Sequence, residues 1–188
     1  MAAERFWLEP KKVRLEDGVE VTLRPEVASD LEPVWDMFSS LSTESLQYLP
    51  VRFTRERVEG WFKEISYDRV LPILAFACAG EGVRVVASAT LSFGGFEHNR
   101  HVATFGVTVH DDYQNMGLGT ALTMYMVEIA EAKGLKRVTL EVVADNLRAV
   151  KVYERCGFRV EGRLRMSHWN YIRGRFCDDL VMGLVLGG

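Results

Sequence analysis

The chain has 188 residues, of which 48% are hydrophobic and 26% are charged, close to the averages for a globular protein. At roughly 150 residues per domain, this length predicts one domain with its own hydrophobic core. The formal net charge of −3 argues against a general nucleic-acid-binding protein, which would carry a basic surface.

The cysteines and the apolar runs also exclude several classes of protein. Cys78, Cys156 and Cys177 form no C-x-x-C pair and are odd in number, so neither a disulfide framework nor a cysteine zinc site is expected. This cysteine usage predicts a cytoplasmic protein. The longest apolar run, 73–79, is far too short to cross a membrane, and residues 1–5 lack the pattern of a signal peptide.

Residues 1–18 are predicted to form a polar lead-in with a turn at Asp17-Gly18, and residues 19–188 to form the single domain. The domain opens with alternating apolar and polar residues over 19–24. This alternation predicts a strand, which Pro25 stops.

Two helices are predicted after this strand. Ser29 and Glu32 have the spacing of a capping box, which predicts a helix over residues 30–41. Thr54 is a typical capping residue, and apolar residues follow it at helical spacing. This pattern predicts a second helix that ends near residue 65.

Three apolar, β-branched runs come next. The runs over 70–79 and 83–93 predict a hairpin, because Gly80-Glu81-Gly82 between them supplies turn residues. The run over 102–109 predicts a third strand.

The second half of the chain predicts a helix over 117–133, a strand over 138–143, a helix over 147–155, a strand from residue 158 and a strand over 176–186. The whole order predicts an α/β fold with a mostly antiparallel, mixed sheet. One strand–helix–strand crossover, from 102 to 143, should join parallel strands.

The segment Gln114-Asn115-Met116-Gly117-Leu118-Gly119 lies between a predicted strand and a predicted helix. Glycines let the backbone approach a bulky anion, and free N–H groups at a helix start favour phosphate; the plain alternative is a tight turn. A P-loop would need Lys and Ser/Thr where Thr120-Ala121 stand. A Rossmann fingerprint would need a third glycine or alanine where Leu122 stands, although Glu141 lies near the place of its ribose-binding acid.

A third interpretation, coenzyme A binding, rests on a resemblance. The chain resembles the acetyl-CoA-binding region of the GNAT superfamily of N-acetyltransferases in the order and spacing of Val107-Thr108-Val109, the glycine loop, Leu140-Glu141-Val142, Asn146, Tyr153 and Gly157-Phe158. The similarity is strong over residues 102–162. It implies a GNAT-like fold, acetyl-CoA as co-substrate, and acetyl transfer to a primary amine by direct attack, without an acyl-enzyme.

The resemblance also implies a set of cofactor-binding residues. The strand backbone would meet the pantetheine arm and the acetyl carbonyl, and the loop would hold the pyrophosphate. The implied residues are Val107, Thr108, Val109, Gln114, Asn115, Met116, Gly117, Leu118, Gly119, Thr120 and Asn146. Asn146 is equally typical of a helix N-cap, and the two roles are compatible.

Tyr153 resembles the general acid of the family, although its helical stripe also fits a core position. The residue that would act as the general base is not identified by the resemblance alone. Thr104 stands where many members carry Glu, and it cannot take a proton. Glu141 lies five residues before Asn146, the place of a base in the members that acetylate N-terminal amines. The alternatives are that Glu141 is a charge on a solvated strand face, or that a water relay serves.

Other candidate sites in the sequence have weaker support. The segment 97–101 has loose His and Glu spacing without a further ligand, so no metal is expected. The aromatic and basic residues over 169–176 could stack nucleic-acid bases, but the net acidity favours a structural or acceptor-facing loop. His110 and His168 are expected on the polar surface. Cys156 has no activating neighbour and is not expected to act as a nucleophile.

The acceptor stays open at this point. Residues 41–53 faintly resemble GNAT domains that acetylate protein lysines, and the Glu141 arrangement resembles those acting on protein N-termini, so a protein amine is expected. The alternatives are a small-molecule amine, such as a polyamine, drug or amino acid, and a non-catalytic acetyl-CoA-binding regulator, which Thr104 suggests. Neither nucleic acid nor membrane is expected as a partner, and a homodimer is left open.

Overall fold

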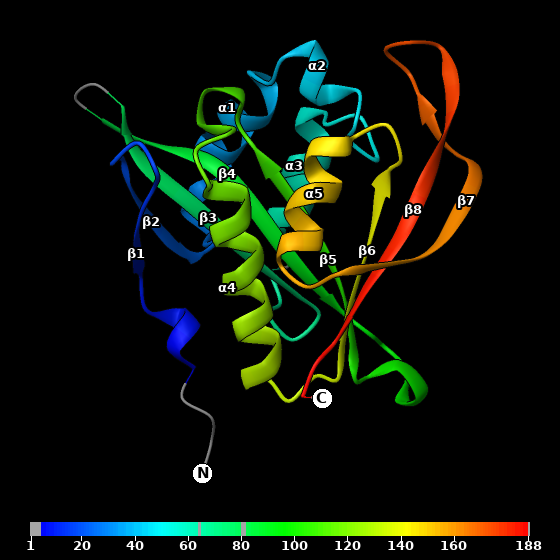
Figure 1. Ribbon diagram of the computed structural model, residues 1–188. Coiled ribbons are helices and arrows are strands. Elements are labelled where there is room, and N and C mark those ends of the chain that lie inside the picture. Colours follow the sequence, from blue (N-terminus) through cyan, green and yellow to red (C-terminus); the bar gives the residue numbers. More distant parts are fainter. Residues whose placement is uncertain (1–4, 64, 80–81, 188) are drawn as a thin grey trace.

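The computed structural model describes residues 5–63, 65–79 and 82–187 (Figure 1). The sequence-based expectation of no signal peptide concerns residues 1–5, most of which lie outside this range. The predicted turn residues Gly80 and Glu81 also lie outside the described residues.

In the described part of the chain, eight strands form one sheet in the order β1-β2-β3-β4-β5-β6-β8-β7 (Figure 1). The strands are β1 Lys11–Arg14, β2 Glu20–Pro25, β3 Val70–Ala79, β4 Gly82–Phe93, β5 Val102–Val109, β6 Arg137–Val143, β7 Arg159–Asn170 and β8 Arg175–Val185. β5 and β6 pair in parallel and the other neighbouring strands pair antiparallel. The predicted mixed α/β sheet with a parallel crossover is confirmed.

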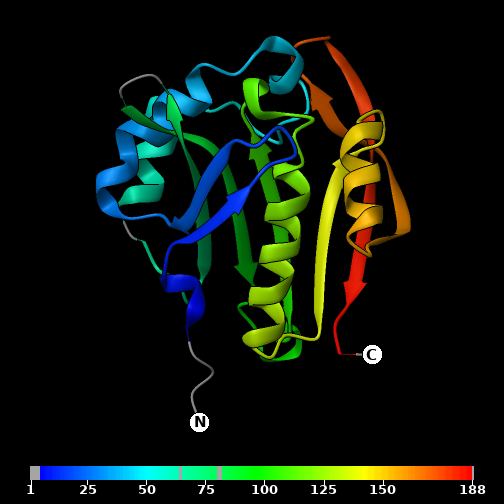
Figure 2. The ribbon, with the colours of Figure 1, turned by 60° about the vertical axis from the view of Figure 1, so that its left-hand side comes forward.

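Helices cover both faces of the sheet (Figure 2). They are α1 Leu31–Ser39, α2 Thr43–Leu46, α3 Arg55–Phe62, α4 Leu118–Ala132 and α5 Leu147–Arg155. Successive strand residues point to opposite faces, and the two cores follow this rule along β3. Ile73 packs in the larger core with α4 and α5, whereas Leu74 packs in a smaller core with α1 and α3.

The segment predicted as a polar lead-in is part of this fold. Residues 11–14 form β1, which pairs antiparallel with β2. Trp7 and Leu15 are buried in the larger core. The turn after β1 contains Gly18 in a left-handed conformation (φ 90°), as its sequence predicts. Hydrophobic alternation is missing from β1 because charged side chains protect this edge of the sheet.

The start of α1 differs from the prediction. The predicted capping box of Ser29 with Glu32 is wrong, because Asp30 is the N-cap residue of the helix. The Asp30 carboxylate accepts the Val27 N–H at 2.8 Å and both terminal nitrogens of Arg24 at 2.7 Å. This two-pronged ion pair joins the end of β2 to the start of α1. The second predicted helix, α3, also ends earlier than expected, at Phe62.

Candidate functional site

β5 and β6 separate after their first residues. The two strands, which lie wholly within the described residues, pair only over residues 102–104 and 137–139. Farther along, the His110 N–H donates to a β4 carbonyl at 2.9 Å. Because peptide groups alternate in direction along a strand, those of Val107 and Val109 point away from β4 and toward the gap. A ligand in this gap can therefore form strand-like hydrogen bonds with β5.

The start of α4 offers N–H groups beside the same gap. The first helical bond runs from the Ala121 N–H to the Gly117 carbonyl at 2.9 Å, so the N–H groups of residues 118–120 have no partner within the helix. Gly117 (φ 84°) and Asn115 (φ 61°) turn the backbone before the helix. The first turn has no acidic residue and no side-chain cap. These amides and the helix dipole fit a phosphate group.

The two loop glycines are required for different reasons. Gly117 has a positive φ, and a Cβ there would lie 3.1 Å from the Glu16 carboxylate. At Gly119, a Cβ would meet only Val109, at an ordinary 3.9 Å. The protein alone therefore has room for a Cβ at position 119. This room lies at the helix start, beside the amides of residues 118–120.

The Gln114 side chain connects the end of β5 to α2. Its Nε2 donates to the Val109 carbonyl and to the Ser45 Oγ, both at 2.9 Å. Ser45 and Ser42 each donate a hydroxyl to the Asp111 carboxylate at 2.6 Å. Although burial opposes it, these hydrogen bonds hold the pKa of Asp111 below its ordinary value. The Gln114 side chain thus joins the glycine loop to α2, and its backbone N–H donates to the Asp111 carbonyl at 3.2 Å. The predicted cofactor contact of Gln114 stays a prediction.

Tyr153 on α5 lies beside β5 and is 8% exposed. Its ring packs edge-on against Phe105, with centroids 6.1 Å apart, and also contacts Phe158. Among the described residues, no group forms a hydrogen bond with the Tyr153 hydroxyl. Burial, with a smaller effect of Cys156, raises the pKa of Tyr153 to about 12. The ring therefore belongs to the core, as the helical stripe predicts, and the hydroxyl keeps its proton at neutral pH.

Asn146 is the N-cap of α5, as predicted. Its Oδ1 accepts the Ala149 N–H at 3.2 Å. Its second predicted role, a contact with coenzyme A, stays a prediction. Thr104 is exposed on β5 and lies opposite Thr139 of β6. Alternation puts both threonines on the sheet face of Glu141.

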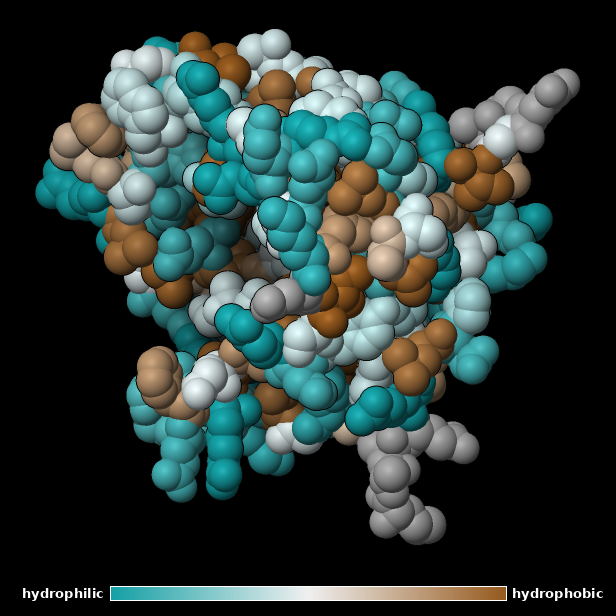
Figure 3. All heavy atoms as spheres, turned by 180° about the vertical axis from the view of Figure 1, so that it is seen from behind, coloured by the Kyte–Doolittle hydropathy of each residue, from teal (hydrophilic) through white to brown (hydrophobic). Residues whose placement is uncertain are grey.

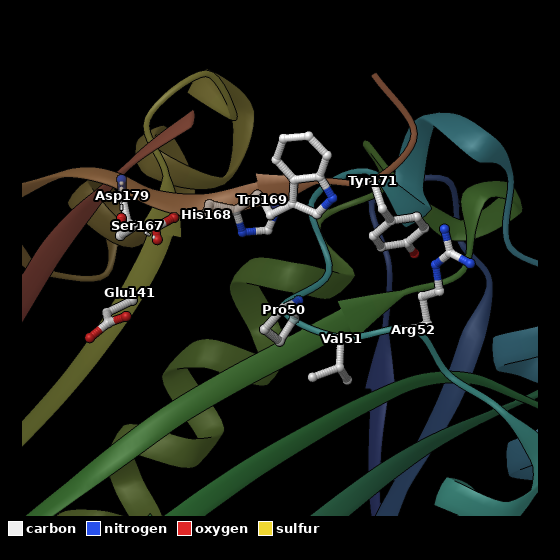
Figure 4. Close-up of a pocket in the computed structure, with 9 residues that line it drawn as sticks. All are labelled: Pro50, Val51, Arg52, Glu141, Ser167, His168, Trp169, Tyr171 and Asp179. Atoms are coloured by element: carbon white, nitrogen blue, oxygen red, sulfur yellow. Dashed lines mark hydrogen bonds between the residues drawn. The ribbon is translucent and has the colours of Figure 1, made fainter. Parts of the chain in front are cut away.

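Glu141 is exposed and lines a cleft of about 640 Å³ (Figure 4). The face of the molecule seen from behind is hollowed on the β7–β8 side (Figure 3). The cleft lies between the segment after α2 and strands β6, β7 and β8, and it is lined by Pro50, Val51, Arg52, Glu141, Ser167, His168, Trp169, Tyr171 and Asp179. Glu141 thus faces a cleft, as its place in β6 predicts, and its role as a base stays a prediction.

The two ends of the cleft differ in charge. Glu141 and Asp179 lie at one end, and Arg52 lies at the other (Figure 4). The Arg52 guanidinium stands over the Tyr171 ring, 4.6 Å from its centroid. Trp169, which is 51% exposed, lies between the two ends. The aromatic segment over 169–176 therefore supplies one wall of the cleft.

The prediction that His110 and His168 are surface residues is wrong, because they are 6% and 8% exposed. His168 Nε2 lies 3.2 Å from the Gln47 carbonyl. His110 Nε2 lies 3.1 Å from the Ser40 Oγ. Both rings join the sheet to the segment containing α1 and α2. The other wall of the cleft, residues 50–52, follows this segment.

Most of the cleft was not predicted from the sequence. Arg52, Ser167 and Asp179 had no predicted role in a site, although Arg52 lies in the segment 41–53 that faintly resembles other GNAT domains. Within residues 5–63, 65–79 and 82–187, no three His, Cys, Asp or Glu side chains are placed to hold a metal ion. The helices of this part are all too short or too polar to span a membrane.

Comparisons with known proteins agree with this architecture. Residues 35–158 match the model of the acetyltransferase (GNAT) family. The chain is 36% identical over 82 residues to the [ribosomal protein bS18]-alanine N-acetyltransferase of Escherichia coli K12, which covers 44% of this chain and 54% of that protein. The chain thus spans about half the length of this relative.

Two further matches cover more of the chain. The L-methionine sulfoximine/L-methionine sulfone acetyltransferase of Pseudomonas paraeruginosa is 30% identical over 131 residues, 68% of this chain and 72% of that protein. A crystal structure of a GNAT-family acetyltransferase from Streptococcus pneumoniae matches with a TM-score of 0.72 and 26% identity, over 89% of this chain and 99% of that one. The family match covers well over half of the sequence, and the chain belongs to the GNAT family of acetyltransferases.

Proposed function

We propose that this protein is an N-acetyltransferase that moves acetyl from acetyl-CoA to a protein amine, an N-terminus or a lysine. The observation that carries the proposal is the gap between β5 and β6. It combines the Val107 peptide groups and the Val109 N–H, an anion-binding helix start and a nearby cleft that contains a carboxylate.

Acetyl-CoA, when bound, supplies an acetyl thioester. The free N–H groups of residues 118–120 hold its pyrophosphate, and the Val107 peptide groups and the Val109 N–H hold the pantetheine arm. N–H groups of β5 also stabilise negative charge on the acetyl oxygen. The Tyr153 hydroxyl, protonated at neutral pH, donates a hydrogen bond to the departing sulfur.

The acceptor must lose a proton before it attacks. A lysine-like amine has a pKa of about 10.4 and reaches the protein mostly charged. The Glu141 carboxylate lines the cleft and accepts this proton, directly or through water. Thr104 cannot replace it, because a hydroxyl group is not a base at neutral pH.

The walls of the cleft support a protein acceptor. Its volume of about 640 Å³ admits a small amine as well as the end of a peptide, so the support comes from the exposed aromatic side chains. The exposed ring of Trp169 contacts that of Phe176, which is 53% exposed, at a centroid distance of 4.8 Å. Exposed aromatic side chains are typical of peptide and protein contacts. The bS18-alanine relative, which by its name acts on a protein, points the same way.

A small-molecule amine is the second candidate. It is supported by the L-methionine sulfoximine/L-methionine sulfone relative, which matches over more of both chains. Thiol release from acetyl-CoA, measured with a panel of peptides, polyamines and amino acids, separates the candidates. We expect turnover with peptides that carry a free N-terminus or lysine, and near-complete loss of turnover in Glu141→Gln.

The other outcomes of this assay each identify an alternative. Turnover restricted to free amino acids or polyamines would favour the small-molecule enzyme. Binding of acetyl-CoA without turnover on any acceptor would reject the proposal and favour the non-catalytic regulator.

A further inference from the structure

A second carboxylate, that of Asp179 on β8, is buried in the cleft. Asp179 is 7% exposed. The Ser167 hydroxyl donates to its Oδ2 at 2.7 Å, and the Asp179 N–H donates to the same hydroxyl oxygen at 3.1 Å. In the described part of the chain, no Lys, Arg or His side chain forms an ion pair with Asp179. A buried carboxylate without a cation is unfavourable, so this arrangement calls for a positive ligand.

A bulge in β7 brings Ser167 to Asp179. The β7–β8 register shifts between Leu164 and His168, and Met166 within the bulge has φ 55°. The Met166 N–H donates to the Asp178 carboxylate at 2.9 Å, which holds this conformation. Bulges redirect side chains, and a left-handed conformation is unfavourable for a residue that has a side chain. The strain here serves to direct a hydroxyl onto a carboxylate in the cleft.

Asp179 and Glu141 share one face of the sheet. Along the β6–β8 pair, Glu141 lies opposite Val181, and Val143 lies opposite Asp179. Residues two apart point to the same face, so the two carboxylates are diagonal neighbours. Figure 4 shows both at the same end of the cleft, away from Arg52. This end therefore attracts a cation and disfavours a neutral or anionic group.

We propose that Asp179, held by Ser167, binds the ammonium group of the acceptor and positions it beside Glu141. The inference rests on the proposed acetyltransferase function. In this arrangement Asp179 serves as the counterion of the ammonium, whose proton then passes to Glu141 and on to solvent. The product amide is neutral and no longer pairs with Asp179, which favours its release. The protein thus selects acceptors that are cationic primary amines.

The test compares Asp179→Asn with Asp145→Asn. Asparagine at 179 has the same shape and still accepts the Ser167 hydrogen bond, but it carries no charge. Asp145 is a matched control, because it is half-exposed, pairs with Arg175 at 2.6 Å and lies outside the cleft lining. We expect Asp179→Asn to raise the KM of the amine at least tenfold with the KM of acetyl-CoA unchanged. Asp145→Asn should change neither.

A binding measurement separates this inference from the proposed function. The probes are a hexapeptide that begins with alanine and its analogue in which lactic acid replaces that alanine, so that a hydroxyl replaces the ammonium. Titration calorimetry without acetyl-CoA should give at least tenfold tighter binding of the amine to the wild-type protein, and Asp179→Asn should remove this preference.

Each result has a defined meaning. Equal binding of the two probes to the wild-type protein, or an unchanged preference in Asp179→Asn, would overturn the role of Asp179 even if the wild-type enzyme acetylates peptides. A preference that depends on Asp179, in a protein that acetylates no amine, would support the cation site and reject the acetyltransferase function instead.

Discussion

Replacing Tyr153 with phenylalanine removes one oxygen and leaves the ring between Phe105 and Phe158. Since no described residue bonds to this hydroxyl, the free energy of unfolding should stay the same or rise by up to about 1 kcal/mol. A positioned proton donor accelerates a reaction by roughly 10²–10⁴-fold, or about 3–5 kcal/mol of activation free energy. We therefore expect kcat to fall at least about 100-fold, with the KM of acetyl-CoA changed by less than about twofold.

The high pKa of Tyr153 determines how its hydroxyl can assist the departure of the thiolate. Burial raises this pKa to about 12, whereas a free thiol has a pKa of about 8.5. Complete proton transfer to a free thiolate would be unfavourable by about 5 kcal/mol. Tyr153 should therefore act by donating a hydrogen bond while charge builds on the sulfur. Because Tyr153 stays protonated well above pH 9, kcat should show no decline from its ionisation between pH 7 and 10.

Tyr125 on α4 provides a matched control. Its hydroxyl is buried without a hydrogen-bond partner among the described residues, and burial, with a smaller effect of Glu128, raises its pKa to about 12, as for Tyr153. Tyr125 packs against Phe6, in the N-terminal part of the chain. Tyr125→Phe should change stability as Tyr153→Phe does and leave thiol release unchanged. Equal turnover of the two variants would refute the role of Tyr153.

Three further predictions concern other parts of the molecule. Gly119→Trp should weaken acetyl-CoA binding at least tenfold by calorimetry while the melting temperature holds, because only Val109 lies near a Cβ at this position; unchanged affinity would contradict the pyrophosphate site. Burial, with a smaller effect of Asp30, raises the pKa of Glu26 from 4.5 to about 7. The folded state therefore binds the Glu26 proton more tightly than the unfolded state, and the free energy of unfolding should fall as pH rises from about 4.5 to 7. Glu26→Gln should remove this loss, up to about 3 kcal/mol at pH 8, in thermal denaturation at pH 4, 6 and 8; the same pH dependence in the variant would refute this assignment. Glu16→Gln should tighten acetyl-CoA binding a few-fold at low salt and less at high salt, because a carboxylate beside Gly117 repels phosphate; weaker binding would argue against that repulsion.

Much of the sheet was predictable because its strands are buried and rich in β-branched residues. β5 has the bounds that its apolar run predicts, and α5 those of its helical pattern. β1 was not predictable, since an edge strand with charged side chains lacks the apolar alternation of a strand. The four-residue α2 was missed because tertiary contacts hold it, including the hydrogen bonds from Ser42 and Ser45 to Asp111.

The candidate site was also only partly predictable from the sequence. The glycine loop and Glu141 are parts of local motifs, which the sequence displays directly. The part of the cleft formed by β7 and β8 depends on the bulge at Met166, and no residue pattern marks a bulge in an exposed strand. The roles of Tyr153 and Glu141, the acceptor, the cytoplasmic location and the domain limits of 19–188 stay predictions.

The short pairing between β5 and β6 has a consequence for motion. Among the described residues, strand pairing joins the β1–β5 part of the sheet to the part formed by β6, β8 and β7 only over 102–104 and 137–139, next to hydrogen bonds from residues 136 and 137 to the His101 carbonyl. A molecule bound along the gap bridges both parts, and a ligand that binds only the folded state stabilises it. The amides of β6 should therefore exchange with solvent more slowly when acetyl-CoA is present. Slower exchange of these amides would show that bound acetyl-CoA links the two parts of the sheet.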